Sequence, residues 1–275
     1  MINLFKTSAR NWLTATLILS LGFIIGCGPR ETQIQKASRE GIMIVGNGAE
    51  PSDLDPQTIT GVPERNITAT MFEGLTRSDP ETLEARPGVA KNWAISDDGL
   101  TYTFHLRAGV TWSDGEPLDA NDFYSSFRRM LAPQLGSDNS DQLYDVVNAE
   151  EFHKGQIDDF SKVGFRVIDD LTLEIKLNHP ASYLLKTMAS LTWVPVPIHV
   201  LEKHGDPLSP GIPWTRPGNL VGNGPFMLKE WKPNSYIEVE RNPRYWNCDT
   251  VKLSGIRFIP MENQPAEEAA FRSGQ

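Results

Sequence analysis

The hydrophobic and polar positions along the chain predict strands mixed with helices from residue 42 onward. Residues 42–45 form a short apolar run typical of a buried strand, whereas Thr101–Leu106 alternates with period two, like a strand with one buried face. A polar turn at residues 169–170 joins the apolar patterns at 165–168 and 171–177, which predicts an antiparallel hairpin. Two late strands are predicted at residues 236–240 and 256–259.

Apolar residues spaced three or four positions apart predict helices between these strands. Ile67, Met71 and Leu75 fall four apart and would share one helical face. Asp119 suits an N-cap, and Asp122 in the following turn favours the helix dipole. The apolar stripe of that helix comprises Ala120, Phe123, Phe127, Met130 and Leu131. Another helix after Pro180 is indicated by Ala181, Leu184, Leu185 and Met188.

The order of these elements bears on the fold class. Residues 205–224 are rich in Pro and Gly and predict a long loop. Hairpin elements occur together with strand–helix elements of the parallel type. This mixture favours an α/β fold that carries an inserted α+β portion.

The start of the chain has the pattern of an export signal. Lys6 and Arg10 supply basic charge, residues 12–25 are apolar, and Ile24-Ile25-Gly26-Cys27 closes the run. This ending resembles a bacterial lipobox, whose cysteine takes a diacylglycerol and becomes the new N-terminus. The alternatives are an ordinary secretory signal that contains a cysteine and a short membrane helix, although a spanning helix needs about 20 apolar residues.

We therefore predict cleavage after residue 26 and an exported protein, in the periplasm or at the cell surface, whose Cys27 carries the lipid. Residues 28–40 are polar and would form the tether between lipid and domain. Gly28 after the cysteine favours sorting of the lipoprotein to the outer membrane, in a host that has one.

Charge and cysteine content exclude several classes of partner and cofactor. The chain has a net charge of −9, and loss of Lys6 and Arg10 with the signal would lower it to −11, which disfavours nucleic acid. Cys248 would be the only cysteine besides Cys27, so we expect no internal disulfide. The five histidines follow no ligand pattern, so no metal and no cofactor are predicted.

Motifs for catalysis are weak or missing. Gly46-Asn47-Gly48 follows a predicted strand, but Pro51 stands where a dinucleotide-binding loop has its third glycine. The chain lacks G-x-S-x-G, H-E-x-x-H and phosphate-loop motifs. Adjacent carboxylates at 97–98, 158–159 and 169–170 are typical of solvated turns. We do not expect an enzyme.

Several motifs resemble landmarks of one protein family. The longest stretch contains Ala90-Lys91-Asn92-Trp93, Asp98-Gly99-Leu100-Thr101-Tyr102-Thr103-Phe104-His105-Leu106-Arg107, Gly109-Val110-Thr111-Trp112-Ser113-Asp114-Gly115-Glu116-Pro117 and Asp122-Phe123. Further landmarks are Glu50-Pro51-Ser52-Asp53-Leu54-Asp55-Pro56, Gly222-Asn223-Gly224-Pro225-Phe226 and Arg241-Asn242-Pro243-Arg244-Tyr245-Trp246. Together they resemble the peptide/nickel family of extracellular solute-binding proteins, family 5, over nearly the whole mature chain.

The resemblance implies a two-lobed periplasmic-binding-protein fold of type II, cluster C. Residues 40–72 and 198–275 would belong to lobe I and residues 73–197 to the inserted α+β domain. Family members are about twice as long, so lobe II would be missing, and the surface that faces it would be exposed. The implied protein is a monomer that captures oligopeptides by hinge closure and delivers them to an ABC permease and ATPase complex.

The resemblance also indicates binding residues. Thr60-Gly61-Val62-Pro63-Glu64-Arg65-Asn66-Ile67 resembles the segment that lies along the peptide backbone in oligopeptide binders, so Thr60, Gly61 and Val62 are the first candidates. A plain loop with Gly61 present for φ alone is the competing interpretation. Asn139, Ser190 and Gln264 align with an aromatic, a histidine and an acidic residue near the peptide, and all three depart from that pattern.

Other landmarks have structural interpretations. Trp93, Phe104 and Trp112 are expected in the core, and Asn223 is expected in a turn. Three alternatives to oligopeptide import stay open: a dipeptide, nickel-chelate or other small-solute binder of the same family, a peptide-sensing lipoprotein without transport, and a truncated remnant. A hydrolase is a remote fourth.

Overall fold

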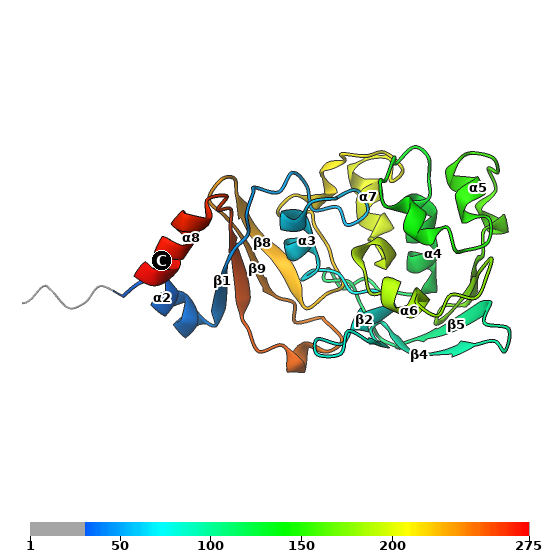
Figure 1. Ribbon diagram of the computed structural model, residues 1–275, viewed down its shortest axis with the longest axis horizontal. Coiled ribbons are helices and arrows are strands. Elements are labelled where there is room, and N and C mark those ends of the chain that lie inside the picture. Colours follow the sequence, from blue (N-terminus) through cyan, green and yellow to red (C-terminus); the bar gives the residue numbers. More distant parts are fainter. Residues whose placement is uncertain (1–30, 275) are drawn as a thin grey trace, which may run out of the picture.

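The computed structural model describes residues 31–274, and two four-stranded sheets form its frame (Figure 1). The first sheet has the order β1 (Ile42–Gly46), β10 (Gly255–Ile259), β9 (Tyr236–Arg241) and β8 (Phe226–Lys232). β1 pairs with β10 in parallel, and the other pairs are antiparallel. Strands from near the two ends of the described chain are therefore neighbours, and only α2 and α8 lie outside the stretch between them.

The second sheet is antiparallel throughout and has the order β4 (Ala90–Ile95), β5 (Thr101–Leu106), β7 (Thr172–Lys176) and β6 (Phe165–Asp169). Alternate residues of β5 are buried, as the period of two predicts. The β6–β7 hairpin is confirmed. A short pair, β2 (Thr76–Ser78) with β3 (Ala85–Pro87), precedes this sheet along the chain.

Helix α4 (Ala120–Met130) covers the second sheet and confirms the predicted cap. The Asp119 side chain accepts hydrogen bonds from the main chain of Asn121 and Asp122, and Asp122 bonds back to the Asp119 N–H in a capping box. All five residues of its predicted stripe are fully buried. The Phe127 ring stacks on Phe165 of β6 with centroids 4.6 Å apart, which joins helix and sheet into one core.

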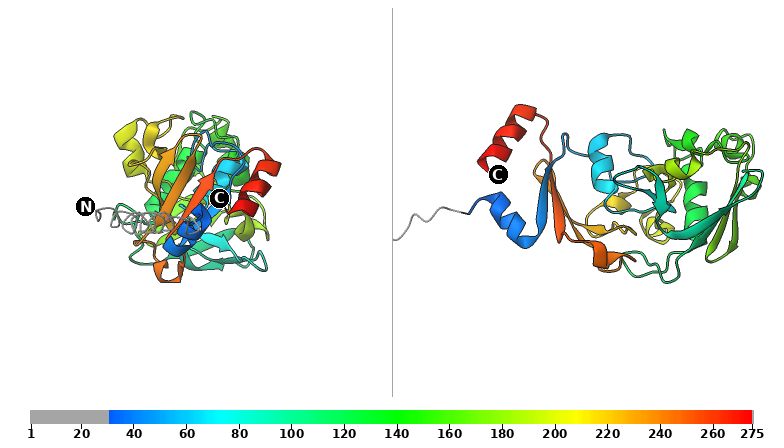
Figure 2. Two further views of the ribbon diagram at one scale, coloured as in Figure 1. Left: turned by 90° about the vertical axis from the view of Figure 1, so that its left-hand side faces the viewer. Right: turned by 60° about the horizontal axis from the view of Figure 1, so that its bottom comes forward.

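The other α-helices are short. They are α2 (Gln33–Glu40), α3 (Val62–Thr68), α5 (Ala149–His153), α6 (Leu184–Thr187), α7 (Ile198–His204) and α8 (Gln264–Ser273). Single 3-10 turns occur at η1 (Ser140–Leu143), η2 (Phe160–Lys162), η3 (Leu191–Trp193), η4 (Pro213–Thr215) and η5 (Cys248–Thr250). Figure 2 shows α2 and α8 at one end of the elongated molecule, beyond the first sheet, while α4 and the second sheet lie toward the other end.

The structure corrects two predictions near the N-terminus. The segment expected to serve as a polar tether forms helix α2 over its last eight residues, because Thr32 and Gln35 make a capping box and Gly41 ends the helix at φ 72°. Residues 28–30 and Cys27 lie outside the described residues. Strand β1 is not buried either: Met43 is 51% exposed, since β1 is an edge strand.

Two further predictions differ from the structure in extent. The helix expected through Leu75 ends at Thr68, although Ile67, Met71 and Leu75 are all fully buried. Beyond Thr68 the main chain pairs with another segment: the Gly224 N–H donates to the Met71 carbonyl at 2.8 Å and the Phe226 N–H to the Thr70 carbonyl at 3.0 Å. A Cβ on Gly222 or Gly224 would overlap the main chain of Met71. The pattern analysis also did not predict strand β8, whose burial follows no clean alternation.

The expected domain division stays a prediction, although the sheets agree with it. All strands of the first sheet lie in residues 40–72 and 198–275, and those of the second lie in 73–197. The predicted 205–224 loop is largely irregular and buries Trp214 completely. Over residues 31–274, no helix combines the length and apolar character needed to cross a membrane.

Candidate ligand-binding site

Residues 60–62, here called the 60–62 segment, lead into the start of helix α3. Gly61 is the N-cap of the helix and is extended, with φ −79° and ψ 153°. Thr60 is exposed, and Val62 is 68% exposed. Within residues 31–274, the main-chain N–H groups of all three residues have no hydrogen-bond partner. The segment therefore offers an extended residue at the helix entrance and three main-chain donors that are free to pair with a second chain.

The structure contradicts the view that Gly61 is present for its φ alone, since φ −79° suits any residue. The reason for glycine is space. A Cβ at this position would overlap Oε2 of Glu64, whose other carboxylate oxygen accepts hydrogen bonds from Ser52 N at 3.0 Å and Ser52 Oγ at 3.3 Å. Gly61 thus lets a buried carboxylate fold back against the N-terminus of its own helix, where negative charge is stabilised.

A buried polar network fixes the loop before the 60–62 segment. Arg129 of α4 forms an ion pair with Asp55 at 2.7 Å, and both side chains are almost fully buried. Arg129 also donates to Gln57 Oε1 at 2.7 Å, while the Trp214 indole donates to Asp55 at 3.2 Å. Ser137 Oγ donates to the Gln57 carbonyl at 2.5 Å. These contacts join the loop to α4 and to the 205–224 loop, so the 60–62 segment starts from a rigid base.

The structure places one of the three less certain candidates beside this segment and connects a second to it through η1. Asn139 Nδ2 donates to the carbonyl of Ile59 at 3.1 Å, next to Thr60. Ser190 Oγ bonds to Gln142 Oε1 at 3.3 Å, and Gln142 lies in η1, the turn that Asn139 begins. Asn139 and Ser190 therefore lie on the same side of the molecule as Thr60. Gln142 was not among the predicted residues, because nothing in its local sequence indicates that its side chain meets Ser190.

Gln264 lies elsewhere. It is the exposed first residue of α8, and it has no contact with the other candidates among the described residues. Its helix packs beside Gly46 at the end of β1, where Glu267 approaches the glycine. The role of Gln264 in binding, like those of the other candidates, stays a prediction.

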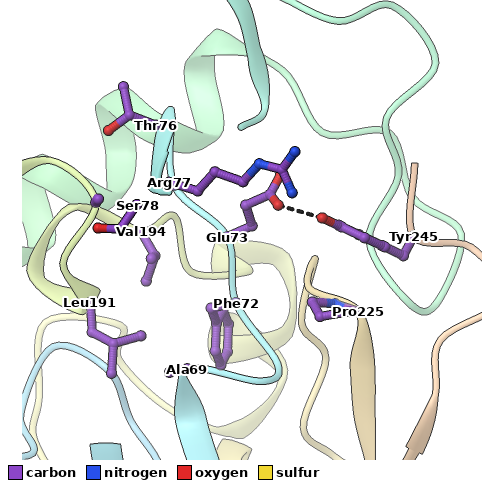
Figure 3. A pocket seen from close by; sticks show the side chains of 12 residues that line it. Ala69, Phe72, Glu73, Thr76, Arg77, Ser78, Leu191, Val194, Pro225 and Tyr245 are labelled. Carbon is purple, nitrogen blue, oxygen red and sulfur yellow. Dashed lines mark hydrogen bonds between the residues drawn. The ribbon is translucent and has the colours of Figure 1, made fainter. Parts of the chain in front are cut away.

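A pocket of about 280 Å³ opens next to Ser190, between residues 69–78 and residues 189–194 (Figure 3). Glu73 forms part of its wall. Tyr245 Oη donates to one Glu73 carboxylate oxygen, and Trp246 Nε1 donates to the other at 2.6 Å. Burial raises the pKa of Glu73, although these two donors and the charges of Arg77 and Arg107 oppose that shift. Burial also raises the pKa of the Tyr245 phenol.

The other landmarks have structural roles. Asn223 accepts from the Glu73 N–H at 3.0 Å and donates to the Glu73 carbonyl at 2.8 Å, so its amide ties the glycine turn to the pocket wall. Phe104 and Trp112 are fully buried, and Trp93 is partly buried against the same core. In the part of the chain that the structure describes, no cluster of three His, Cys, Asp or Glu residues could hold a metal.

Comparison with known proteins identifies the family. The model of the bacterial extracellular solute-binding proteins, family 5 Middle, matches residues 84–275. The periplasmic oligopeptide-binding protein OppA of Escherichia coli (strain K12) is 37% identical over 235 residues, which cover 85% of this chain and 42% of OppA. YgiS of the same organism is a probable deoxycholate-binding periplasmic protein. It is 34% identical over 231 residues, which cover 83% of this chain and 42% of YgiS.

A solved structure agrees with these relatives. The crystal structure of Haemophilus influenzae OppA in complex with the peptide RPPGFSPFR matches with a TM-score of 0.80 at 34% identity, covering 86% of this chain and 45% of that chain. The chain therefore belongs to the family 5 extracellular solute-binding proteins, and the predicted fold class is confirmed over the part that it covers. It spans less than half the length of these relatives. At the family level, this membership supports an exported binding protein rather than an enzyme.

Proposed function

We propose that this chain supplies one wall of the peptide-binding cleft of a lipid-anchored, exported receptor that delivers oligopeptides to an ABC permease and its ATPase. The observation that carries the proposal is the 60–62 segment, in which Gly61 is extended, Thr60 and Val62 are exposed, and the main-chain N–H groups have no partner within residues 31–274. Main-chain groups are common to every peptide, so pairing along this segment would bind peptides of varied sequence. No bond is made or broken, and closure around the peptide completes the function.

The segment's position also supports the proposal. Asn139 lies beside it, and Gln142 and Ser190 follow along the turn that Asn139 begins, so the nearby polar groups are neutral, which suits side chains of varied character. The buried Asp55–Arg129 pair fixes its base, so the segment loses little conformational entropy when a peptide binds. The similarity to oligopeptide-binding proteins, one of them solved with a nonapeptide, is in accord with this role.

A pair of substitutions at Val62 tests main-chain pairing. Val62→Pro removes the main-chain N–H, and α3 should tolerate it, because Val62 is the first helical residue and the preceding Gly61 is extended. Val62→Ala is the matched control that shortens the side chain and keeps the donor. With the full-length protein and tetra-alanine as probe, calorimetry should show about tenfold weaker binding for Val62→Pro, the loss of roughly one hydrogen bond. Val62→Ala should stay within about twofold of the unsubstituted protein, a difference of a few tenths of a kcal/mol.

The same pair of variants separates the two explanations of any loss. Equal losses in both variants would assign the effect to the valine side chain and overturn main-chain recognition. Thermal unfolding of both variants checks that α3 is intact.

A second candidate function is binding of an apolar small solute. Val62 exposes 68% of its surface beside the neutral polar groups, and the relative YgiS is a probable deoxycholate-binding protein. Titration of the full-length protein with deoxycholate, in parallel with tetra-alanine, distinguishes the two. Binding of deoxycholate without binding of the peptide would establish the second function in place of the first.

A further inference from the structure

The pocket beside Ser190 has a size and a lining that suit a single residue of a ligand. Its volume of about 280 Å³ lies just below the range of whole-ligand sites, which begins at roughly 300 Å³. Phe72, Leu191 and Val194 supply an apolar lining, and the exposed Ala69 stands among the lining residues. The pocket therefore has room for one aliphatic or aromatic side chain.

The charge around the pocket favours an anion. Arg77 lies beside the Glu73 carboxylate in Figure 3, and its Nε donates to the Pro87 carbonyl at 3.1 Å. Its terminal nitrogens have no hydrogen-bond partner among residues 31–274. The Arg107 guanidinium lies 3.8 Å from the centroid of the Trp246 ring, and its charge lowers the pKa of Glu73. The charges of Arg77 and Arg107 both favour the ionised form of Glu73, and Arg77 itself lines the pocket, so a guanidinium group is available to an anion there.

Helix α3 connects this pocket with the 60–62 segment. Val62, Asn66 and Ala69 are exposed and lie four and three positions apart, so they share one face of the helix. Val62 belongs to the 60–62 segment at one end of this face, and Ala69 lines the pocket at the other. Seven residues of helix rise about 10 Å, the length of roughly three extended residues.

From these observations we propose that the pocket binds the C-terminal residue of a peptide, with an apolar side chain against Phe72 and Leu191 and the terminal carboxylate on Arg77. The inference rests on the proposed function, because it takes the 60–62 segment as the place where the same peptide pairs. It predicts that the protein prefers peptides that end in an apolar residue with a free carboxylate.

The test compares Ala-Ala-Ala-Leu with its C-terminal amide by calorimetry on the full-length protein. The unsubstituted protein should bind the acid about tenfold more tightly than the amide, as expected for a charge-assisted hydrogen bond. Arg77→Gln should abolish that preference and leave the affinity for the amide unchanged. The matched control is Arg65→Gln, which removes the same charge from an exposed residue of α3 outside the pocket and should keep the preference. An undiminished preference in Arg77→Gln overturns the proposal.

A second variant fills the pocket and does not depend on charge. Ala69→Trp places a large side chain at an exposed lining position and should weaken the binding of acid and amide alike, by about tenfold or more. Unchanged binding in this variant also overturns the pocket assignment. Circular dichroism on each variant separates loss of the pocket from loss of the fold.

The failure of this inference is distinguishable from failure of the proposed function. If neither peptide binds the unsubstituted protein, the proposed function fails. The pocket is then tested with N-acetyl-leucine against its amide by ligand-observed NMR. Binding of the acid that Ala69→Trp abolishes supports the pocket, and absence of binding overturns it.

Discussion

At the scale of single residues, carboxylates that are buried or partly buried have four different environments. Asp55 is paired with Arg129, Glu73 is held by two neutral donors, and Glu64 lies at a helix N-terminus. Asp122 is a fourth case: burial raises its pKa from 3.8 to about 6, and the charge of Asp119 adds to that shift. A carboxyl of this kind makes the stability of the protein depend on pH.

The raised pKa of Asp122 predicts how the stability of the protein depends on pH. Because the folded state binds this proton more tightly than the unfolded state, stability should fall as the pH rises from 3.8 to about 6, by at most about 3 kcal/mol. Asp122→Asn keeps an acceptor for the Asp119 N–H and removes the titration, so its free energy of unfolding should vary less across this interval. Urea unfolding at pH 4 and pH 7 measures the difference.

Asp98→Asn is the opposing control for this measurement. The Ser96 hydroxyl and the Leu100 N–H hold the pKa of Asp98 below its ordinary value, so Asp98 contributes stability that is lost at low pH. Removing it should lower the stability at neutral pH and make the loss of stability toward low pH shallower. If Asp122→Asn and the unsubstituted protein show the same pH dependence, the raised pKa of Asp122 is wrong.

At the scale of elements, helix α3 and the loop before it depend on contacts with distant segments. The loop reaches α4 through Asp55 and Gln57, and the 205–224 loop through Trp214. The end of α3 packs under the glycine turn at residues 222–224. The 60–62 segment is therefore positioned by three parts of the chain that are far apart in sequence.

Asp55→Ala tests this anchoring. The substitution leaves Arg129 buried without its partner, and the free energy of unfolding should fall by about 3–5 kcal/mol. Lys154→Ala is the control, because it removes an exposed ion pair with Glu150 and should cost less than about 1 kcal/mol. Denaturant unfolding measures both variants. A loss from Asp55→Ala no larger than that from Lys154→Ala would show that the network does not hold the loop.

At the scale of the whole molecule, the two sheets contribute to one core. Hydrophobic residues of both sheets belong to a single buried cluster, including Val239 of β9 and Phe104 of β5. The end formed by α2, β1 and α8 exposes Met43 and Phe271, with Phe271 78% exposed. The expectation that such a surface faces the second lobe of the family stays a prediction.

Lipid attachment is the prediction that belongs to the whole molecule. The lipobox pattern places a diacylglycerol on Cys27, so the protein extracted from its membrane should carry the lipid mass in an intact native mass spectrum. Cys27→Ala should lose that mass and the membrane association. Cys248→Ala, at the second cysteine of the chain, should keep both. Lipid retained on Cys27→Ala would exclude Cys27 as the site of attachment.

Much of the local structure could be predicted because it depends on neighbouring residues. The period of two in β5, the hairpin of β6 and β7, and the cap of α4 at Asp119 all follow from patterns within a few positions. Strand β8 and the early end of α3 could not be predicted. They depend on pairing with β9 and on the packing of Gly222 and Gly224 against Met71.

The same division holds for the candidate site. The sequence alone indicated the family, through its motifs, and the 60–62 segment. Only the tertiary structure brought Asn139 beside that segment, connected Ser190 to it through Gln142, separated Gln264 from them, and formed the pocket at Glu73. The physical reason is that periodicity records which face of an element is buried. The meeting of distant side chains depends on the path of the whole chain between them.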